Sequence, residues 1–392
     1  MLDQLPMLLI KGLGYLFLIG IPIIIISIFY KKGLEQKKID WFSKIRFIVI
    51  KIQVPKLNEK TPLAAEQMFA ALHGIYKAGE PYQEYISFEI AAKDKYLQFY
   101  VTCPTHLKEF IQSQIYAQYP TAEIFEVDDY ALEDIERIKS KELKIAGVDL
   151  SLTNNDVYPL KTFLNFEVDP LAAITGVMSR VERGEQIWVQ MMVKPISDDW
   201  QKKSIGHIKT TKSGSGKTNI FSEITFAISH AISGIITTVL TGATPASTIG
   251  ADGEKKETSL SGTVEAGLKG VETKATKLGF GTKIRIIALA PNENVAHAKI
   301  ASVVGAFKQF NLLNMNGFKA SLIHGSFDFF KEYQRRWFVD EGYILNIEEL
   351  ASIYHLPSIS VQTPNIVWAG SKKGEPPADL PIEENVEESD LT

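Results

Sequence analysis

Alternating and apolar runs divide the first half of the chain into short strands and helices. Strands are predicted at residues 45–54, 85–91, 96–102 and 122–127. Apolar residues at helical spacing predict one helix that starts at Thr61-Pro62 and another that starts at Thr105. The resulting order, β-α-β-β-α-β, predicts a split βαβ or ferredoxin-like unit, which is a four-stranded antiparallel sheet with two helices on one face.

The same pattern is predicted to occur a second time. The segment Thr61–Ala65 reads TPLAA and the segment Asp169–Ala173 reads DPLAA, so each opens a helix in the same way. The second copy would place strands at 160–168, 186–193, 283–289 and 318–323, with helices at 170–182 and 292–310. We therefore predict an α+β chain with two tandem ferredoxin-like units.

A long insertion, residues 197–278, interrupts the second unit. It contains a predicted helix at 220–240, with isoleucines on one side and serines and threonines on the other, and a second helix at about 261–278. Packing within the protein, on a partner or on a membrane surface all fit these helices. The loop Thr211–Thr218 is similar to a phosphate-binding loop, but it has threonine where the motif requires glycine, and no buried strand precedes it. We interpret it as a Ser/Gly linker.

The N-terminal stretch Gly12–Tyr30 has no charged residue, and twelve of its nineteen residues are Leu, Ile or Phe. As a helix it would be about 28 Å long, close to the ~30 Å hydrocarbon core of a bilayer. It lacks the small-residue cleavage site of a signal peptide. The sequence therefore predicts a transmembrane helix, anchored by Leu13, Leu16, Phe17, Ile21, Ile24, Ile28 and Tyr30.

Basic residues follow this stretch at once, whereas only Lys11 precedes it closely. The positive-inside rule places the C-terminal side in the cytoplasm. We thus expect a single-pass protein of a bacterial cell membrane with its N-terminus outside. The residues that would set this topology are Lys31, Lys32, Lys37 and Lys38.

Composition limits the chemistry that the chain can perform. The single cysteine, Cys103, excludes an intramolecular disulfide. The net charge is −4, and the last eighteen residues carry seven acids and no base, so the chain lacks the charge of a strong nucleic-acid binder. The seven histidines are scattered without metal-ligand spacing, and no nucleophile motif is present. We expect no catalytic residues, no cofactor and no metal.

The C-terminal part continues beyond the second unit with the aromatic and basic stretch FDFFKEYQRRWF and with a helix that a capping box, Asn346 and Glu349, should start. The acidic tail is too charged and too poor in apolar residues to fold alone. The predicted organisation is a tail and transmembrane helix at 1–32, a linker at 33–44, unit 1 at 45–130, unit 2 at 150–325, a helical and extended segment at 326–370, and a disordered tail at 371–392.

Several segments, KATKLGFGTKIRIIALAPNENVAHAKIASVVGAFKQFN, ILNIEELASIYHLPS and TPNIVWAGSKKGEPPADLP, resemble the region before the motor in membrane-anchored bacterial ATPases. These ATPases are of the coupling-protein and HerA-like kind and are related to conjugative type IV secretion. The motor and its phosphate-binding loop would follow this region, and this sequence contains no counterpart of them. The resemblance implies a link to DNA or protein transfer and assigns no ATPase residue.

The resulting functional hypothesis is a non-catalytic, membrane-anchored scaffold that docks a cytoplasmic motor ATPase and other secretion subunits. One alternative is the N-terminal fragment of a split translocation ATPase, and another is a membrane-tethered RNA-binding protein. Self-association and direct nucleic-acid binding remain open. Because aromatic and Arg residues most often anchor interfaces, we expect the partner contact at Arg335, Arg336 and Trp337.

Overall fold

Local sequence signals explain where several elements begin and end. Strands β2 (Ile86–Lys93) and β3 (Tyr96–Pro104) are joined by Asp94 and Lys95, which have φ values of 48° and 79°. Positive φ at both turn residues matches the twist of a two-residue hairpin. The capping box that the sequence predicts is confirmed at the start of α11 (Ile347–Ile353), where Asn346 and Glu349 bond to each other's backbone N–H groups.

The structure is a computed structural model, and it describes residues 5–212 and 262–370. The remaining strands are β1 (Phe47–Gln53), β4 (Glu123–Val127), β5 (Lys144–Leu152), β6 (Gln186–Pro195), β7 (Gly279–Ala290), β8 (Phe318–Ala320) and β9 (Tyr343–Asn346). The remaining α-helices are α1 (Leu5–Ser43), α2 (Pro62–Leu72), α3 (Lys108–Gln118), α4 (Ile135–Lys139), α5 (Leu171–Met178), α6 (Asp199–Lys212), α8 (Gly262–Ala275), α9 (Glu293–Phe307) and α10 (Phe327–Gln334).

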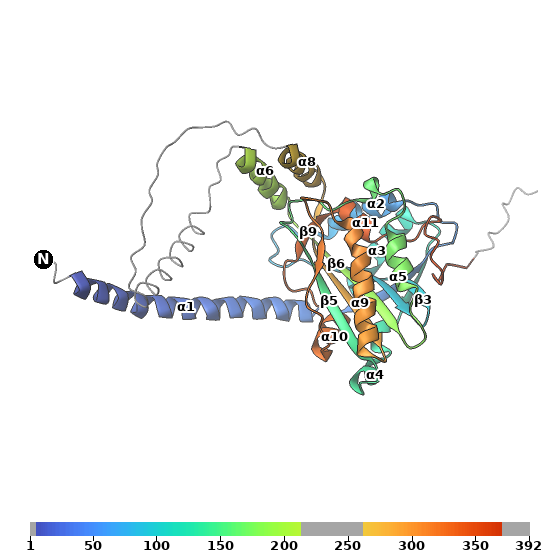
Figure 1. The fold of residues 1–392 in the computed structure, drawn as a ribbon, viewed down its shortest axis with the longest axis horizontal. Coiled ribbons are helices and arrows are strands. Elements are labelled where there is room, and N and C mark those ends of the chain that lie inside the picture. The colour runs from blue at the N-terminus through green and yellow to red at the C-terminus, as the bar shows by residue number, and fades with distance from the viewer. Residues whose placement is uncertain (1–4, 213–261, 371–392) are drawn as a thin grey trace, which may run out of the picture.

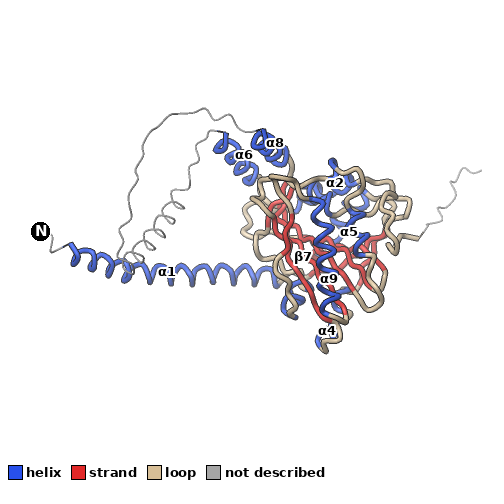
Figure 2. The backbone as a smooth tube through the Cα atoms, in the orientation of Figure 1, coloured by secondary structure: helices blue, strands red, loops and turns tan. Residues whose placement is uncertain are grey.

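The nine strands of the described residues form one antiparallel sheet (Figures 1 and 2). Its order is β4-β1-β3-β2-β6-β7-β5-β8, and β9 pairs with the first residues of β7. The prediction of two separate four-stranded sheets is therefore wrong. Strands β2 and β6 pair from Ile86–Val193 to Lys93–Gln186 and make the sheet continuous. Both strands are buried along nearly their whole length, so neither could remain an exposed edge.

The strand predicted at residues 160–168 is also wrong. That region contains a short 3-10 helix, Phe163–Asn165, and extended loop, whereas the strand lies earlier, at β5. The analogy between the two helix starts placed the strand directly before Pro170. In the structure a connection of about eighteen residues separates β5 from α5. The position of the helix start therefore did not predict the position of the strand before it.

The two faces of the sheet are covered unequally. Helices α2, α3, α5, α9 and α11 pack on one face over the largest cluster of buried apolar residues (Figure 1). The opposite face, called here the second face, is covered by α10, by the 3-10 helix Tyr130–Leu132 and by α4. A smaller core on the second face contains Trp188, Ile287 and Phe330.

Helix α1 runs for 39 residues and extends away from the sheet (Figure 1). Within the part of the chain that the structure describes, no helix is long and apolar enough to cross a membrane. This finding contradicts the predicted transmembrane helix.

The roles predicted for the anchor and topology residues depended on a transmembrane helix, so they fall with that prediction. Of the anchor residues, Ile21, Ile28 and Tyr30 are exposed on α1, and of the topology residues Lys31, Lys32 and Lys37 are exposed. Lys38 instead forms an ion pair with Glu341, with 2.6 Å between Nζ and Oε1.

The C-terminal end of α1 is fixed on the second face. Phe42 is buried against Tyr85, and the two ring centroids are 5.5 Å apart. Met192 and Phe338 complete this small core. Apolar contacts and the Lys38–Glu341 ion pair therefore hold the helix at the point where it meets the sheet.

The insertion into the second unit begins and ends with α6 and α8, which pack on each other. Trp200 of α6 is buried and lies against Gly279, where a larger side chain would overlap its indole ring. The predicted helix at 220–240, most of the loop Thr211–Thr218 and the acidic tail from residue 371 lie outside the described residues.

Gly147 allows α10 to lie directly on β5. A Cβ atom at this position would overlap the ring of Phe329. We expect Gly147→Ala to lower the free energy of unfolding by about 1–3 kcal/mol, because either the ring or the helix must move. Chemical denaturation measures this change.

The control is Gly176→Ala in α5, where the space around the added methyl is open. Alanine is the better helix former by up to about 1 kcal/mol, so this variant should be as stable as the parent or more stable. Equal stability of the Gly147→Ala and parent chains would contradict the close packing of α10.

Candidate functional site

A row of polar side chains crosses the second face of the sheet. The register pairs Tyr100 with Glu89, Glu89 with Gln190, Gln190 with Arg285, and Arg285 with Asp149. Directly paired residues of neighbouring strands point to the same face. Five strands, β3, β2, β6, β7 and β5, therefore place one polar residue each in a continuous row.

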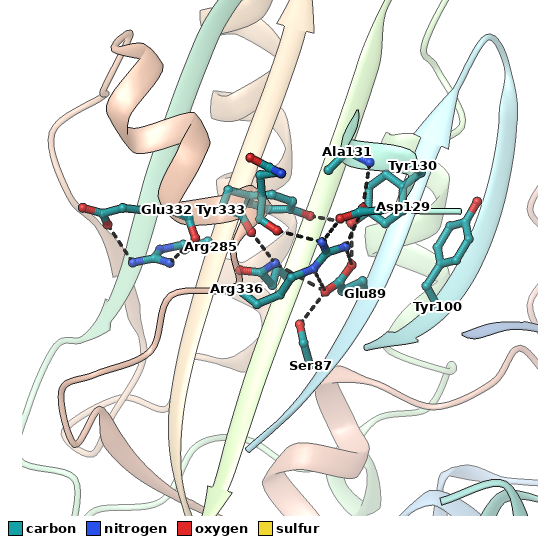
Figure 3. Close-up of polar contacts among 12 residues, drawn as sticks. Ser87, Glu89, Tyr100, Asp129, Tyr130, Ala131, Arg285, Glu332, Tyr333 and Arg336 are labelled. Carbon is teal, nitrogen blue, oxygen red and sulfur yellow. Dashed lines mark hydrogen bonds and ion pairs between the residues drawn. The ribbon is translucent and has the colours of Figure 1, made fainter. Parts of the chain in front are cut away.

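Glu89 is the second residue of this row and is fully buried. Its carboxylate accepts hydrogen bonds from Ser87 Oγ at 2.6 Å, Tyr130 OH at 2.7 Å and Gln190 Nε2 at 3.4 Å. Arg336 donates to both carboxylate oxygens, from Nε at 2.9 Å and from Nη2 at 3.0 Å (Figure 3). Such a two-point contact is the strongest geometry for an Arg–carboxylate pair.

Arg336 is supplied by the connection that follows α10. Its φ of 51° lies in the left-handed region, where the chain leaves the helix. The guanidinium also forms an ion pair with Asp129 and donates to the carbonyl oxygen of Gln334 at 2.7 Å. Two carboxylates from distant parts of the chain thus compensate one buried cation.

Arg285 forms a second anchor in the same row. Its side chain pairs with Asp149 and with Glu332, each at 3.0 Å, and it donates to the carbonyl oxygen of Trp337 at 2.8 Å. Arg285 and Arg336 therefore hold the segment Phe327–Glu341 on the sheet at two points (Figure 3). We call this segment the strap.

The electrostatics of the cluster favour fixed charges. Burial alone would raise the pKa of Glu89, but the charge of Arg336 and the hydrogen bonds from Arg336, Ser87 and Tyr130 lower the pKa below its ordinary value. Burial would likewise lower the pKa of Arg336, and the Glu89 carboxylate raises it well above the ordinary value. Burial raises the pKa of Tyr130 and Tyr333, so both phenols stay neutral. These fixed charges hold the strap on the sheet. The carboxylate of Glu89 is fully occupied by its hydrogen bonds, so it is not available to accept a proton from a substrate.

An open groove of about 710 Å³ lies beside this cluster. Its walls are the end of α1, with Ile39 and Phe42, and the strap residues 334–337. Strands β1 and β3 form its floor, and the chain from Glu126 to Leu132 closes one end. The volume lies within the range of protein ligand pockets, so this groove is the candidate functional site.

The structure separates the three residues predicted to contact a partner. Arg335 is exposed and Trp337 is half-buried, and both line the groove. Arg336 also borders it but is only 3% exposed and is bound to Glu89 and Asp129. Its guanidinium is already satisfied inside the protein, so we do not propose Arg336 as a partner contact.

A second polar cluster only resembles a catalytic triad. Buried His355 contacts Asp169 at 2.8 Å through Nε2, and Ser358 and Ser360 donate to the same carboxylate at 3.3 Å. In a catalytic triad the histidine lies between the acid and the serine, whereas here the acid lies between them. His355 Nδ1 is 2.8 Å from the carbonyl oxygen of Ala351. Asp169 also accepts from the backbone of Leu171, so this cluster fixes the start of α5.

Sequence reasoning missed the residues that hold the site together. Glu89 interrupts the apolar strand ISFEIAA, and a lone acid in a buried strand is a signal that a cation must meet it. Nothing local indicates that the cation is Arg336, which is 247 residues away. Among residues 5–212 and 262–370 there is also no group of three or more His, Cys, Asp or Glu side chains that could hold a metal ion.

A double-mutant cycle tests the Glu89–Arg336 pair. Glu89→Gln and Arg336→Gln should each lower the free energy of unfolding by about 3–5 kcal/mol, because each leaves a buried charge without its main partner. The double variant should lose clearly less than the sum of the two single changes. Strict additivity would show that the pair is not coupled.

The pair also predicts how stability depends on pH. Because the folded pKa of Glu89 lies below its unfolded value of about 4.3, the ionised carboxylate stabilises the fold above that pH. This contribution is lost as pH falls through the folded pKa. The stability difference between the parent and Glu89→Gln should therefore shrink as denaturation is measured at pH values below about 4.

Comparison with known proteins gives a family and no activity. No curated protein matches the sequence. The family described as a domain of unknown function, DUF8128, matches residues 34–369, which include the sheet, the strap and the groove. The chain belongs to this family of domains of unknown function.

Proposed function

We propose that this chain is a non-catalytic docking subunit that holds a partner protein against the second face of its sheet. The observation that carries the proposal is the groove, because Arg335 and Trp337 border it while the strap beneath them is fixed. Aromatic and Arg side chains on a rigid support are typical anchors of protein interfaces.

Most of the charged residues that line the groove are already paired within the protein, which favours a binding role over a chemical one. Glu89 and Asp129 both pair with Arg336, and Glu126 pairs with Lys108. A catalytic acid or base needs a proton that it can exchange with substrate, whereas these groups are committed to structural ion pairs. We therefore propose that the chain is not an enzyme.

The resemblance to the region before the motor of translocation ATPases suggests the partner. We propose a motor ATPase of a DNA- or protein-transfer apparatus, bound as a separate chain. The alternative role in RNA binding requires exposed aromatic residues in the middle of the central strands. Phe99 and Tyr100 are 2% and 8% exposed, so we do not extend the proposal to RNA.

Arg335→Glu tests the docking surface. Affinity purification of the tagged full-length chain from its native cells should recover a nucleotide-hydrolysing ATPase, identified by mass spectrometry. The reversed charge should lower this recovery by about tenfold, because a cation at an interface is replaced by a repelling anion.

The matched control is Arg183→Glu, at an exposed arginine of the turn before β6, away from the groove-lining residues. It should recover as much ATPase as the parent chain. If the parent recovers none, the docking function is wrong. If Arg335→Glu recovers as much as the parent, the partner binds elsewhere.

A further inference from the structure

The floor of the groove holds a polar group without a partner. Thr102 of β3 is 1% exposed and lines the groove, and its Oγ1 atom makes no hydrogen bond within the described residues. Buried hydroxyl groups are normally hydrogen-bonded. The unpartnered hydroxyl of Thr102 leaves one hydrogen-bonding group in the lining of the groove to which a polar atom of an occupant can bond.

The floor and the walls of the groove provide mainly apolar surface. The groove is lined by Ile45, just before β1, and by Phe47 and Val49 of β1. Phe42 of α1 and Trp337 of the strap also line it. Leu132 lies at the far end and is 47% exposed. A large apolar side chain entering here would bury surface that is now in contact with water.

Some charged residues at the groove have ion-pair partners within the protein and others do not. Glu126, Asp129 and Arg336 have ion-pair partners in the protein. Arg335 and Asp128 are both exposed, and neither forms an ion pair within the described residues. Arg335 and Asp128 thus offer an occupant one unpaired cation and one unpaired anion beside a mainly apolar surface.

We propose that the groove binds a short peptide segment of the partner, in which a large apolar side chain lies next to an acidic residue. The acid pairs with Arg335, a basic group or the segment's own cationic end meets Asp128, and a polar atom of the peptide bonds to Thr102. A peptide provides all of these groups in one chain, including main-chain donors and acceptors. This inference rests on the proposed docking function and specifies what the partner presents.

The experiment starts from a display library of random short peptides selected on the full-length chain. Enriched peptides should combine an aromatic or large aliphatic residue with a neighbouring Asp or Glu. A synthetic, fluorescently labelled copy of the strongest binder then gives dissociation constants by anisotropy for the parent and for variants.

Arg335→Glu should weaken this peptide by about tenfold or more, because the cation that meets its acid becomes an anion. Thr102→Val should weaken it several-fold without lowering the melting temperature, because valine has nearly the same shape and the lost hydroxyl has no partner in the protein. Arg183→Glu should bind as the parent does.

Two results would overturn the inference. One is that no peptide is enriched, and the other is that enriched peptides bind Arg335→Glu and Thr102→Val as tightly as the parent. If native purification still recovers the ATPase in either case, the docking function stands and the peptide groove is wrong. A competition measurement gives a third such result. If a small carboxylate binds the parent through Arg335 without displacing the peptide, then the peptide does not occupy the site at Arg335 and the inference is wrong.

Discussion

The guanidinium of Arg336, held between Glu89 and Asp129, is the interaction on which this structure most depends. Burying an ion costs several kcal/mol unless its partners are well placed, and here both carboxylates and several neutral donors complete the cluster. The cost makes the arrangement selective, because a displaced strap would leave Glu89 charged and unpaired inside the sheet. The position of the strap thus depends on these ion pairs as well as on the apolar area that Phe330, Tyr333 and Phe338 bury.

The strap in turn organises what surrounds it. Phe338 joins Phe42 and Tyr85 in the small core that receives α1, and Glu341 pairs with Lys38 on that helix and with Lys194 of the sheet. Trp337 and Arg335 are carried to the edge of the groove by the same turn that buries Arg336. The place where α1 leaves the sheet, the groove and the buried cluster are therefore parts of one assembly on the second face.

Pairing of β2 with β6 gives this assembly its support. The polar row from Tyr100 to Asp149 crosses the junction between the two halves of the sheet, and Glu89 and Gln190 are the residues on either side of it. Because the sheet is continuous, a segment near the C-terminus can bind residues of both halves at once. A surface fixed in this way needs little reorganisation when it binds, which lowers the entropic cost of association.

The sequence by itself determined the elements whose signals are local. The hairpin at Asp94-Lys95, the proline start of α2 and the capping box of α11 each depend on residues within a few positions of one another. Tertiary structure alone decided the strand of the second half at 144–152, the joining of the sheets, the burial of Arg336 and the exposure of Arg335. Two adjacent arginines read alike in a sequence, and only the acid brought opposite one of them, 247 residues away, makes it part of the interior. The pairing of strand edges and of buried charges depends on contacts between distant segments. No local sequence pattern predicts such contacts.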